Sequence, residues 1–194
     1  MRYYPVFLDL LERPCLVIGQ GQLADEKVAQ LEQAGAHVLR NSHFDRTQAK
    51  QVFLIVAALE NSKQAQEIKN FGDRNRIFVN VVDKTDYCSF IVPAIVDRGN
   101  LLIAISTSGK SPAIASQIRK QLEKQFGHEY SDLLEVLAEI RPQVKKTFHT
   151  FEQRKDFYLK LIQKNLLQTI QTAGLTAVRE KIQQELHKQT DLED

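Results

Sequence analysis

The chain has 194 residues, 43% hydrophobic and 26% charged, so it can build one medium core or two small ones. Its 26 lysines and arginines nearly balance its 24 aspartates and glutamates, which argues against a dedicated nucleic-acid binder. No apolar run reaches the roughly 18 to 20 residues that span a bilayer, and residues 1–10 lack the apolar region and cleavage site of a signal peptide. We therefore expect a cytoplasmic protein with no membrane or nucleic-acid partner.

The first hundred residues alternate β-rich runs with helical stretches, the pattern of a mostly parallel sheet built from βαβ units. The runs predict strands at about 15–18, 36–40, 52–57, 77–82 and 101–106. Between the first two strands, apolar residues recur at near helical period and stop at Gly35, a suitable residue just past a helix end. A second helix is predicted at about 61–70, capped by Asn61 or Ser62.

The pattern becomes helical at Ser111-Pro112, a cap followed by proline at the first helical position. Residues 128–194 contain one glycine, Gly174, and no convincing strand. These helical faces are too many for so small a region to bury alone, which favours docking onto a partner subunit. We predict an α/β chain with three parts: a Rossmann-like domain (1–110), a helical dimerisation region (111–148) and a C-terminal helical region (149–194).

A glycine-rich turn follows the first predicted strand and opens a helix, the context that a dinucleotide-binding fingerprint requires. Gly19 and Gly21 would let a pyrophosphate approach backbone N–H groups, and Ala24 would replace the third glycine. The alternative is a glycine turn that binds no ligand. The acidic residue expected about 20 positions later is missing, because the second strand ends at Leu39-Arg40-Asn41. Arg40 could meet a 2′-phosphate, so NAD and NADP both stay open.

Asp83 follows a buried strand, at the sheet edge where open α/β folds bind ligands. Its carboxylate could act as a general acid or base, or could accept a proton as a substrate is metallated. The alternative is that Asp83 only caps the loop before Tyr87. The two cysteines and five histidines lack the spacing of metal ligands, so we predict no metal site.

The segment 106–112 joins a strand to a helix and collects hydroxyls, a cation and backbone donors, which suits a carboxylate or phosphate ligand. A well-capped helix start is the alternative. Further along, basic residues outnumber acidic ones and predict a basic helical surface, unless they form an ordinary solvated face. These basic residues are Arg141, Lys145, Lys146, Arg154, Lys155, Lys160 and Lys164.

Three stretches, YPVFLDL (4–10), CLVIGQGQLADEK (15–27) and NVVDKTDYCSFIVPAIVDRGNLLIAISTSGKSP (80–112), together resemble one enzyme family. This is the precorrin-2 dehydrogenase / sirohydrochlorin ferrochelatase family, whose members stand alone or form the N-terminal part of siroheme synthase. The resemblance runs from about Tyr4 to Leu122 and more loosely through the helical tail.

The resemblance implies an NAD-dependent oxidation of precorrin-2 to sirohydrochlorin by a homodimer, with insertion of ferrous or cobaltous ion in bifunctional members. It places the family's essential aspartate at Asp83 and a phosphorylatable serine position at Thr107. The substrate contacts it implies are Thr107, Ser108, Lys110 and Ser111. The cofactor contacts it implies are Gly19, Gly21, Gln22, Leu23, Ala24, His43 and Phe44.

One region departs from the family pattern. The stretch from Arg40 to Phe53 is about twenty residues short, as though one peripheral αβ piece of the sheet were absent. This shortening would uncover the adenosine side of the cofactor. It keeps two alternatives open: a non-catalytic tetrapyrrole-binding protein and a chain with chelatase activity only. A third alternative uses the basic helices to bind nucleic acid.

Overall fold

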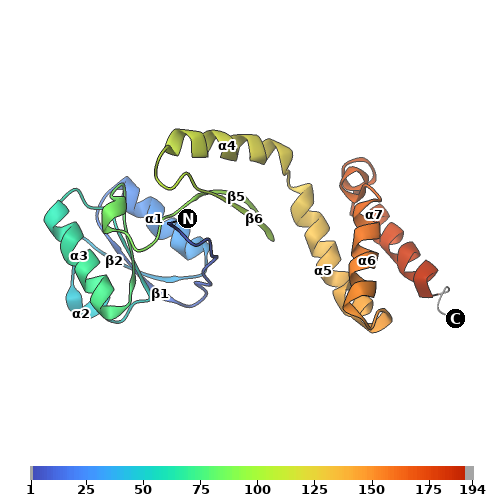
Figure 1. Ribbon diagram of the computed structural model, residues 1–194, viewed down its shortest axis with the longest axis horizontal. Helices are drawn as coiled ribbons and strands as arrows, with labels where there is room; N and C mark the ends of the chain where they lie inside the picture. Colours follow the sequence, from blue (N-terminus) through green and yellow to red (C-terminus); the bar gives the residue numbers. More distant parts are fainter. Residues whose placement is uncertain (1, 191–194) are drawn as a thin grey trace. The chain divides into compact units, whose positions relative to one another are not determined.

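The computed structural model describes residues 2–190 and divides the chain into two compact units (Figure 1). The first comprises Met1–Pro93 with Ser106–Pro112, and the second comprises Ala94–Ile105 with Ala113–Asp194. Met1 and residues 191–194, at the ends of the predicted regions 1–110 and 149–194, lie outside the described residues. Within the described range, every helix is too short or too polar to cross a membrane.

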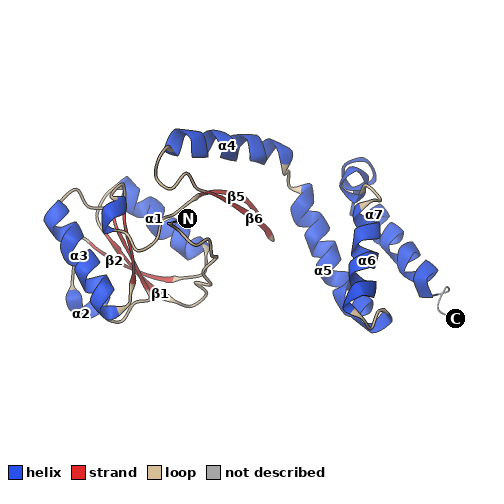
Figure 2. Ribbon diagram, viewed as in Figure 1, coloured by secondary structure: helices blue, strands red, loops and turns tan. Residues whose placement is uncertain are grey.

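The first unit contains the predicted parallel sheet (Figure 2). Its four strands run in the order β2-β1-β3-β4 and are β1 (Pro14–Ile18), β2 (His37–Asn41), β3 (Leu54–Ala57) and β4 (Phe78–Val81). Ile18 pairs in register with Asn41 and Ala57, and Ala57 pairs with Val81. The four strands therefore end level with one another, and the loops that follow them share one edge.

Helices cover both faces of this sheet because successive β1 residues point to opposite sides. Leu16 and Ile18 pack in the cluster that includes Ile68 of α3 (Ser62–Asn75). Cys15 and Val17 pack in the cluster that includes Ala24 of α1 (Gln22–Gln33). Figure 1 shows α1 and α3 on the two sides of the sheet. The predicted parallel sheet with its two flanking helices is confirmed.

The two predicted helices begin close to their expected positions, but α3 runs five residues past its expected end at 70, to Asn75. The glycine at position 72 does not end α3, because it faces the sheet: an added Cβ would lie 2.3 Å from Val79 Cγ2. Instead α3 ends at Arg76, whose left-handed backbone (φ 58°) donates its N–H to the Gly72 carbonyl. A short helix, α2 (Arg46–Ala49), was not predicted.

The fifth predicted strand does not join the parallel sheet. β6 (Leu101–Ile105) pairs antiparallel with β5 (Ala94–Arg98), and the two form a separate hairpin in the second unit. The turn Gly99-Asn100 explains this difference, because Gly99 takes φ 63° and a two-residue loop of this type joins antiparallel strands. Arg98 donates to the carbonyls of Phe126 (2.8 Å) and Glu123 (3.1 Å) and so attaches the hairpin to the end of α4 (Pro112–Gln125).

The described part of the chain after α4 is all helical, as the sequence predicts. Its helices are α5 (Glu129–Thr147), α6 (Phe151–Ile162) and α7 (Leu166–Thr190). Their apolar faces share one core that includes Val136, Phe157 and Ile182. The Thr150 hydroxyl accepts the Gln153 N–H, and the Gln153 side chain accepts the Thr150 N–H, so a capping box begins α6. Gly174 (φ 78°) interrupts α7.

A largely buried ion pair joins the α6–α7 connection to α7. Lys164 Nζ lies 2.5 Å from Glu185 Oε2, and the Glu185 side chain is only 10% exposed. The hydrogen bond from Lys164 holds the pKa of Glu185 below its ordinary value, although burial acts in the opposite direction. A lowered folded-state pKa stabilises the fold above the unfolded-state pKa and loses that effect as the pH falls through the folded value.

We therefore expect Glu185→Gln to destabilise the protein by about 1–3 kcal/mol at pH 7, because Lys164 loses its charged partner. The difference from wild type should shrink as the pH falls below about 4.3, where unfolded glutamate takes up a proton. Urea unfolding followed by circular dichroism at pH 7 and pH 3 measures both effects. The control is Glu180→Gln, an exposed position on the same helix. Equal losses in the two variants at pH 7 would contradict the role of the pair.

Candidate functional site

The glycine turn after β1 has two glycines with different constraints. An added Cβ at Gly19 (φ 142°) would lie 2.6 Å from the Ala58 carbonyl oxygen, so this glycine lets the turn pack against the loop after β3. At Gly21 (φ 75°) an added Cβ would meet nothing within 4 Å. Gly21 is the N-cap of α1 and no side chain caps the helix. The amino terminus of α1 thus has no side-chain cap and has open space beside Gly21, which fits a bound pyrophosphate.

The next three predicted cofactor residues belong to the first turn of α1. Gln22 and Leu23 are exposed, and Gln22 Nε2 donates to Glu26 Oε1 at 3.0 Å. Ala24 is fully buried between the helix and the sheet. A small residue at position 24 keeps α1 close to β1, the role that the third glycine of the fingerprint performs.

The two predicted contacts after β2 lie in different environments. His43 is exposed, and its Nδ1 lies 3.2 Å from the Ser42 hydroxyl. The Phe44 ring packs edge-on against Phe71 of α3, with ring centroids 5.3 Å apart. His43 is therefore accessible to a ligand at the strand end, whereas the Phe44 side chain contributes to the core.

Asp83 lies at the end of β4 in a left-handed conformation (φ 60°) and is exposed. Its carboxylate makes no hydrogen bond or ion pair within the described part of the chain. The N–H of Tyr87 is bound by the Lys84 carbonyl (3.0 Å), so the alternative that Asp83 caps this loop is wrong. Lys84 Nζ contacts the Glu60 carbonyl and the Ser62 hydroxyl (3.1 Å), which ties the Asp83 turn to the loop after β3.

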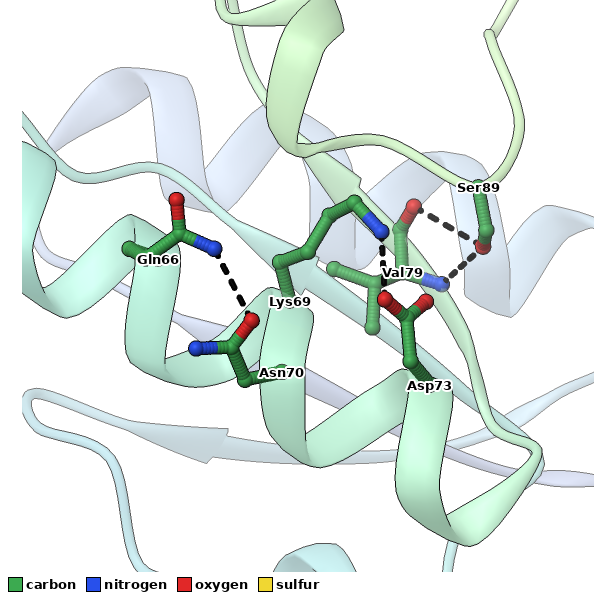
Figure 3. Close-up of polar contacts among 6 residues, drawn as sticks. All are labelled: Gln66, Lys69, Asn70, Asp73, Val79 and Ser89. Atoms are coloured by element: carbon green, nitrogen blue, oxygen red, sulfur yellow. Dashed lines mark hydrogen bonds and ion pairs between the residues drawn. The ribbon is translucent and has the colours of Figure 1, made fainter.

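Residues that the sequence analysis did not single out hold this turn in place. The buried Asn80 side chain donates to the Phe90 carbonyl (3.1 Å), and Cys88 Sγ accepts the Val81 N–H (3.2 Å). Figure 3 shows the Ser89 hydroxyl bound to both the N–H (2.8 Å) and the carbonyl (3.3 Å) of Val79.

These contacts show that the segment after Asp83 folds back along β4. The sequence pattern that could have predicted these contacts is the presence of polar residues within and just after a buried strand. Burial raises the pKa of Cys88, so its thiol stays protonated near neutral pH and serves this structural role.

The hydroxyl-rich loop 106–112 lies against the Asp83 turn. An added Cβ at Gly109 (φ 78°) would lie 3.2 Å from Thr85 Cγ2, and Thr85 begins a short 3-10 helix (η1, Thr85–Tyr87) two residues after Asp83. Thr107 Oγ1 accepts the Ser111 N–H (3.2 Å) and donates to the Ser111 carbonyl (3.1 Å), so it shapes the loop. Ser108 and Lys110 are exposed.

The predicted basic surface belongs to the second unit, and two of its seven members have structural contacts. Arg154 donates to the carbonyls of Phe148 and His149 (both 2.9 Å), and Lys164 pairs with Glu185. The other five are exposed: Arg141, Lys145, Lys146, Lys155 and Lys160. Among the described residues, no group of three or more histidines, cysteines, aspartates or glutamates could hold a metal ion.

Family models match almost the whole chain in consecutive segments. "Putative NAD(P)-binding" matches residues 6–44 and 38–94, "Sirohaem biosynthesis protein central" matches 98–125, and "Sirohaem synthase dimerisation region" matches 129–186. The chain belongs to the siroheme synthase family. These matches confirm the resemblance found in the sequence.

Named relatives agree with this assignment. A siroheme synthase of Ruthia magnifica is 35% identical over 181 residues, which cover 82% of this chain and 38% of the relative. A siroheme synthase of Methylobacillus flagellatus is 33% identical over 213 residues, which cover 99% of this chain and 46% of the relative. The chain thus spans less than half the length of these relatives. A solved structure, "SirC, precorrin-2 dehydrogenase", shares the fold (TM-score 0.62, 23% identity) over 96% of this chain and all of the other.

The comparisons show that a relative carries residues that this chain lacks. The match to Methylobacillus flagellatus extends over 213 residues, more than the 194 of the chain, so the relative carries extra residues inside the matched region. The NAD(P)-binding model matches in two pieces that overlap at residues 38–44, at the end of β2. In doubly wound folds a further strand lies outside the second one, whereas β2 is the edge strand here. The expected shortening after Arg40 therefore agrees with the sheet.

We expect Gly21→Asp to abolish dinucleotide binding in a folded protein, because a side chain and a negative charge would occupy the open space before α1. Isothermal titration calorimetry with NAD and NADP measures the loss, and thermal unfolding reports the fold. Gly174→Asp is the matched control, since Gly174 has a similar φ (78° against 75° at Gly21) and equally open space in the second unit. Unchanged affinity for both dinucleotides in folded Gly21→Asp would show that this turn is not part of the dinucleotide site.

Proposed function

We propose that this chain oxidises precorrin-2 to sirohydrochlorin with a nicotinamide dinucleotide as the electron acceptor. One observation carries the proposal: the Asp83 carboxylate, which has no partner among the described residues, lies at the same edge of the parallel sheet as the uncapped amino terminus of α1. The hydroxyl-rich loop 106–112 lies beside the Asp83 turn. A dinucleotide site, a proton acceptor and anion-binding groups thus come from neighbouring loops.

The chain's own residues would hold the cofactor through its backbone. The free N–H groups of α1 would bind the pyrophosphate, Gly21 would leave room for it, and His43 would lie near the ribose after β2. When bound, the nicotinamide ring supplies a two-electron acceptor.

Asp83 would take the proton released as the substrate loses two electrons to the acceptor. Its exposed carboxylate has no competing partner in the described residues, and Lys84 fixes the adjacent backbone through the loop after β3. A carboxylate held in this way can accept a proton without first breaking a hydrogen bond. The same group would serve as proton acceptor if ferrous or cobaltous ion is a second substrate.

The tetrapyrrole is a polycarboxylate, so the site needs cations and N–H or O–H donors. Ser108 and Lys110 are exposed in the loop beside Asp83 and can provide such contacts. Thr107 and Ser111 would contribute by holding the loop in shape. The match of 129–186 to a dimerisation region supports a homodimer, whose second copy would cover the exposed apolar residues of the helical part.

Incubation of the purified chain with precorrin-2 and NAD or NADP tests the proposal through the absorbance of the reduced nicotinamide. Reduction of the dinucleotide only when precorrin-2 is present supports it. Tetrapyrrole binding without reduction would favour the non-catalytic binding protein. Addition of ferrous or cobaltous ion to sirohydrochlorin without dinucleotide then tests for chelatase activity alone.

Asp83→Asn keeps the shape and hydrogen-bonding reach of the side chain but cannot take up the proton. We expect turnover to fall about 10²- to 10⁴-fold with dinucleotide affinity unchanged. The matched control is Asp86→Asn, an exposed carboxylate three residues later. Full activity in folded Asp83→Asn would show that another group accepts the proton.

Reversal of Lys145 and Lys146 to glutamate tests whether the exposed basic residues of α5 attract the polycarboxylate. We expect the apparent KM for precorrin-2 to rise more than kcat changes, because the lysines would act on binding rather than on the chemical step. Steady-state kinetics at low salt measures both. The double reversal of Lys120 and Lys124 on α4 is the control with the same change of charge. Identical effects of the two double reversals on KM would show that Lys145 and Lys146 belong to an ordinary solvated face of α5.

A further inference from the structure

A basic groove lies on the face of the parallel sheet that α2 and α3 cover. Ala49 of α2 and Ile68 of α3 pack in the same core cluster, whereas α1 covers the opposite face. The groove between α2 and α3 has a volume of about 560 Å³. It is lined by residues from the first turn of α3 (Lys63) to the last (Arg74), which at 1.5 Å per residue is roughly 16 Å. Among the described residues that line it, none is a proposed contact of the dinucleotide or the tetrapyrrole.

Positive charge dominates the lining of this groove. Four cations and one acid give it a formal net charge of +3, and these residues are Arg46, Lys50, Lys63, Arg74 and Glu67. The acid is already neutralised, because Arg46 donates to Glu67 Oε1 from both Nε (3.1 Å) and Nη2 (2.6 Å). The side chains of Lys50, Lys63 and Arg74 are exposed and make no hydrogen bond or ion pair with other described residues. Three cations therefore remain available to an anionic partner.

Carboxamide side chains lie among the cations. Gln66 Nε2 donates to Asn70 Oδ1 at 2.9 Å (Figure 3), which leaves the Gln66 oxygen as an acceptor and the Asn70 amide as a donor for another molecule. Asn75 Nδ2 donates to the Phe71 carbonyl at 2.8 Å, so the Asn75 side-chain oxygen can accept a further hydrogen bond. Each unit of a peptide backbone offers one N–H donor and one C=O acceptor. These carboxamides can therefore bind a peptide backbone, while the cations bind its acidic side chains.

The distribution of the cations favours an extended peptide over a small anion or a nucleic acid. Arg46 begins α2 and Lys50 caps it, while Lys63 and Arg74 lie in the first and last turns of α3, so a small anion could contact only part of this row. An extended peptide advances about 3.3 Å per residue, and about five residues would span the groove with alternate side chains on one side. A nucleic acid is disfavoured because Glu67 lies in the groove and the formal charge of the whole chain is only +2.

We propose that the groove between α2 and α3 is a docking site for an extended acidic segment of a partner protein. Carboxylates of this segment would pair with Lys50, Lys63 and Arg74, in the way that basic clusters recognise acidic motifs. Gln66 and Asn70 would bind its backbone. This docking site does not depend on the proposed oxidation of precorrin-2, because none of the groove residues takes part in that reaction.

Fluorescence anisotropy of the full chain with a fluorescein-labelled peptide tests the proposal. The probe is an eight-residue peptide of alternating glutamate and serine. We expect saturable binding with a Kd of about 1–100 µM at low salt, weakened about 3- to 10-fold when salt is raised to about 0.15 M. The same peptide with glutamine in place of glutamate keeps the shape but has no charge, so it should bind at least about 10-fold more weakly.

Lys63→Glu with Arg74→Glu reverses the charge at the two ends of the α3 side of the groove. We expect this variant to bind the peptide at least about 10-fold more weakly, because like charges would then face each other. The matched control is Lys120→Glu with Lys124→Glu, an equal change of charge at exposed positions of α4, which should bind nearly as wild type does. Thermal unfolding shows whether each variant is folded. If the reversal does not fold, Lys63→Gln with Arg74→Gln removes the charges without adding acids and should weaken binding about 3- to 10-fold.

Several results would overturn the proposal. Equal binding of the glutamate and glutamine peptides would show that charge does not select the partner, and equal losses in the two charge-reversal variants would place the contact elsewhere. Tighter binding of inorganic pyrophosphate or of a single-stranded oligonucleotide would assign the groove to that anion instead. Displacement of the peptide by NAD or NADP would show that the groove belongs to the dinucleotide site. Absence of saturable binding by wild type would also overturn it.

Discussion

The close approach of Gly19 to the Ala58 carbonyl is the constraint on which the candidate site depends. Only a glycine lets the turn after β1 lie against the loop after β3, since an added Cβ would come within 2.6 Å of that oxygen. The contact fixes the start of α1 at the carboxyl edge of the sheet. Lys84 then joins the loop after β3 to the Asp83 turn, so three successive loops along the sheet edge are coupled by contacts between neighbours.

Much of the fold could be predicted because its signals are local. Buried strands and their capped helices follow from short apolar runs and from residues such as Asn61 and Gly35. The pairing of the last predicted strand could not be predicted from its apolar residues, because they suit both a parallel and an antiparallel neighbour. It depended on Gly99-Asn100, a two-residue turn that joins β5 and β6 as an antiparallel hairpin.

In the candidate site, too, the sequence predicts some features and not others. Gly21 and Asp83 could be proposed from the sequence because each follows a predicted buried strand, at the sheet edge where open α/β folds bind ligands. The partners of Thr107 could not, because the same hydroxyl can bind a ligand or cap its own loop, and only the folded backbone decides between them. Asn80 and Cys88 went unnoticed since their role is to anchor a segment whose path becomes clear only in three dimensions.

The shortened segment after β2 determines which side chains at the strand end are engaged by the fold. Without a strand outside β2, the end of that strand lies at the margin of the sheet, and α2 alone returns the chain to β3. Asn41 and Asp45 hold this short connection through their hydrogen bonds with Gln48 and Thr47. Arg40 takes no part in this connection because it lies on the other face of β2, where it pairs with Asp25 of α1. The absence of a strand outside β2 thus decides which side chains at its end hold the connection to β3 and which one pairs with α1 instead.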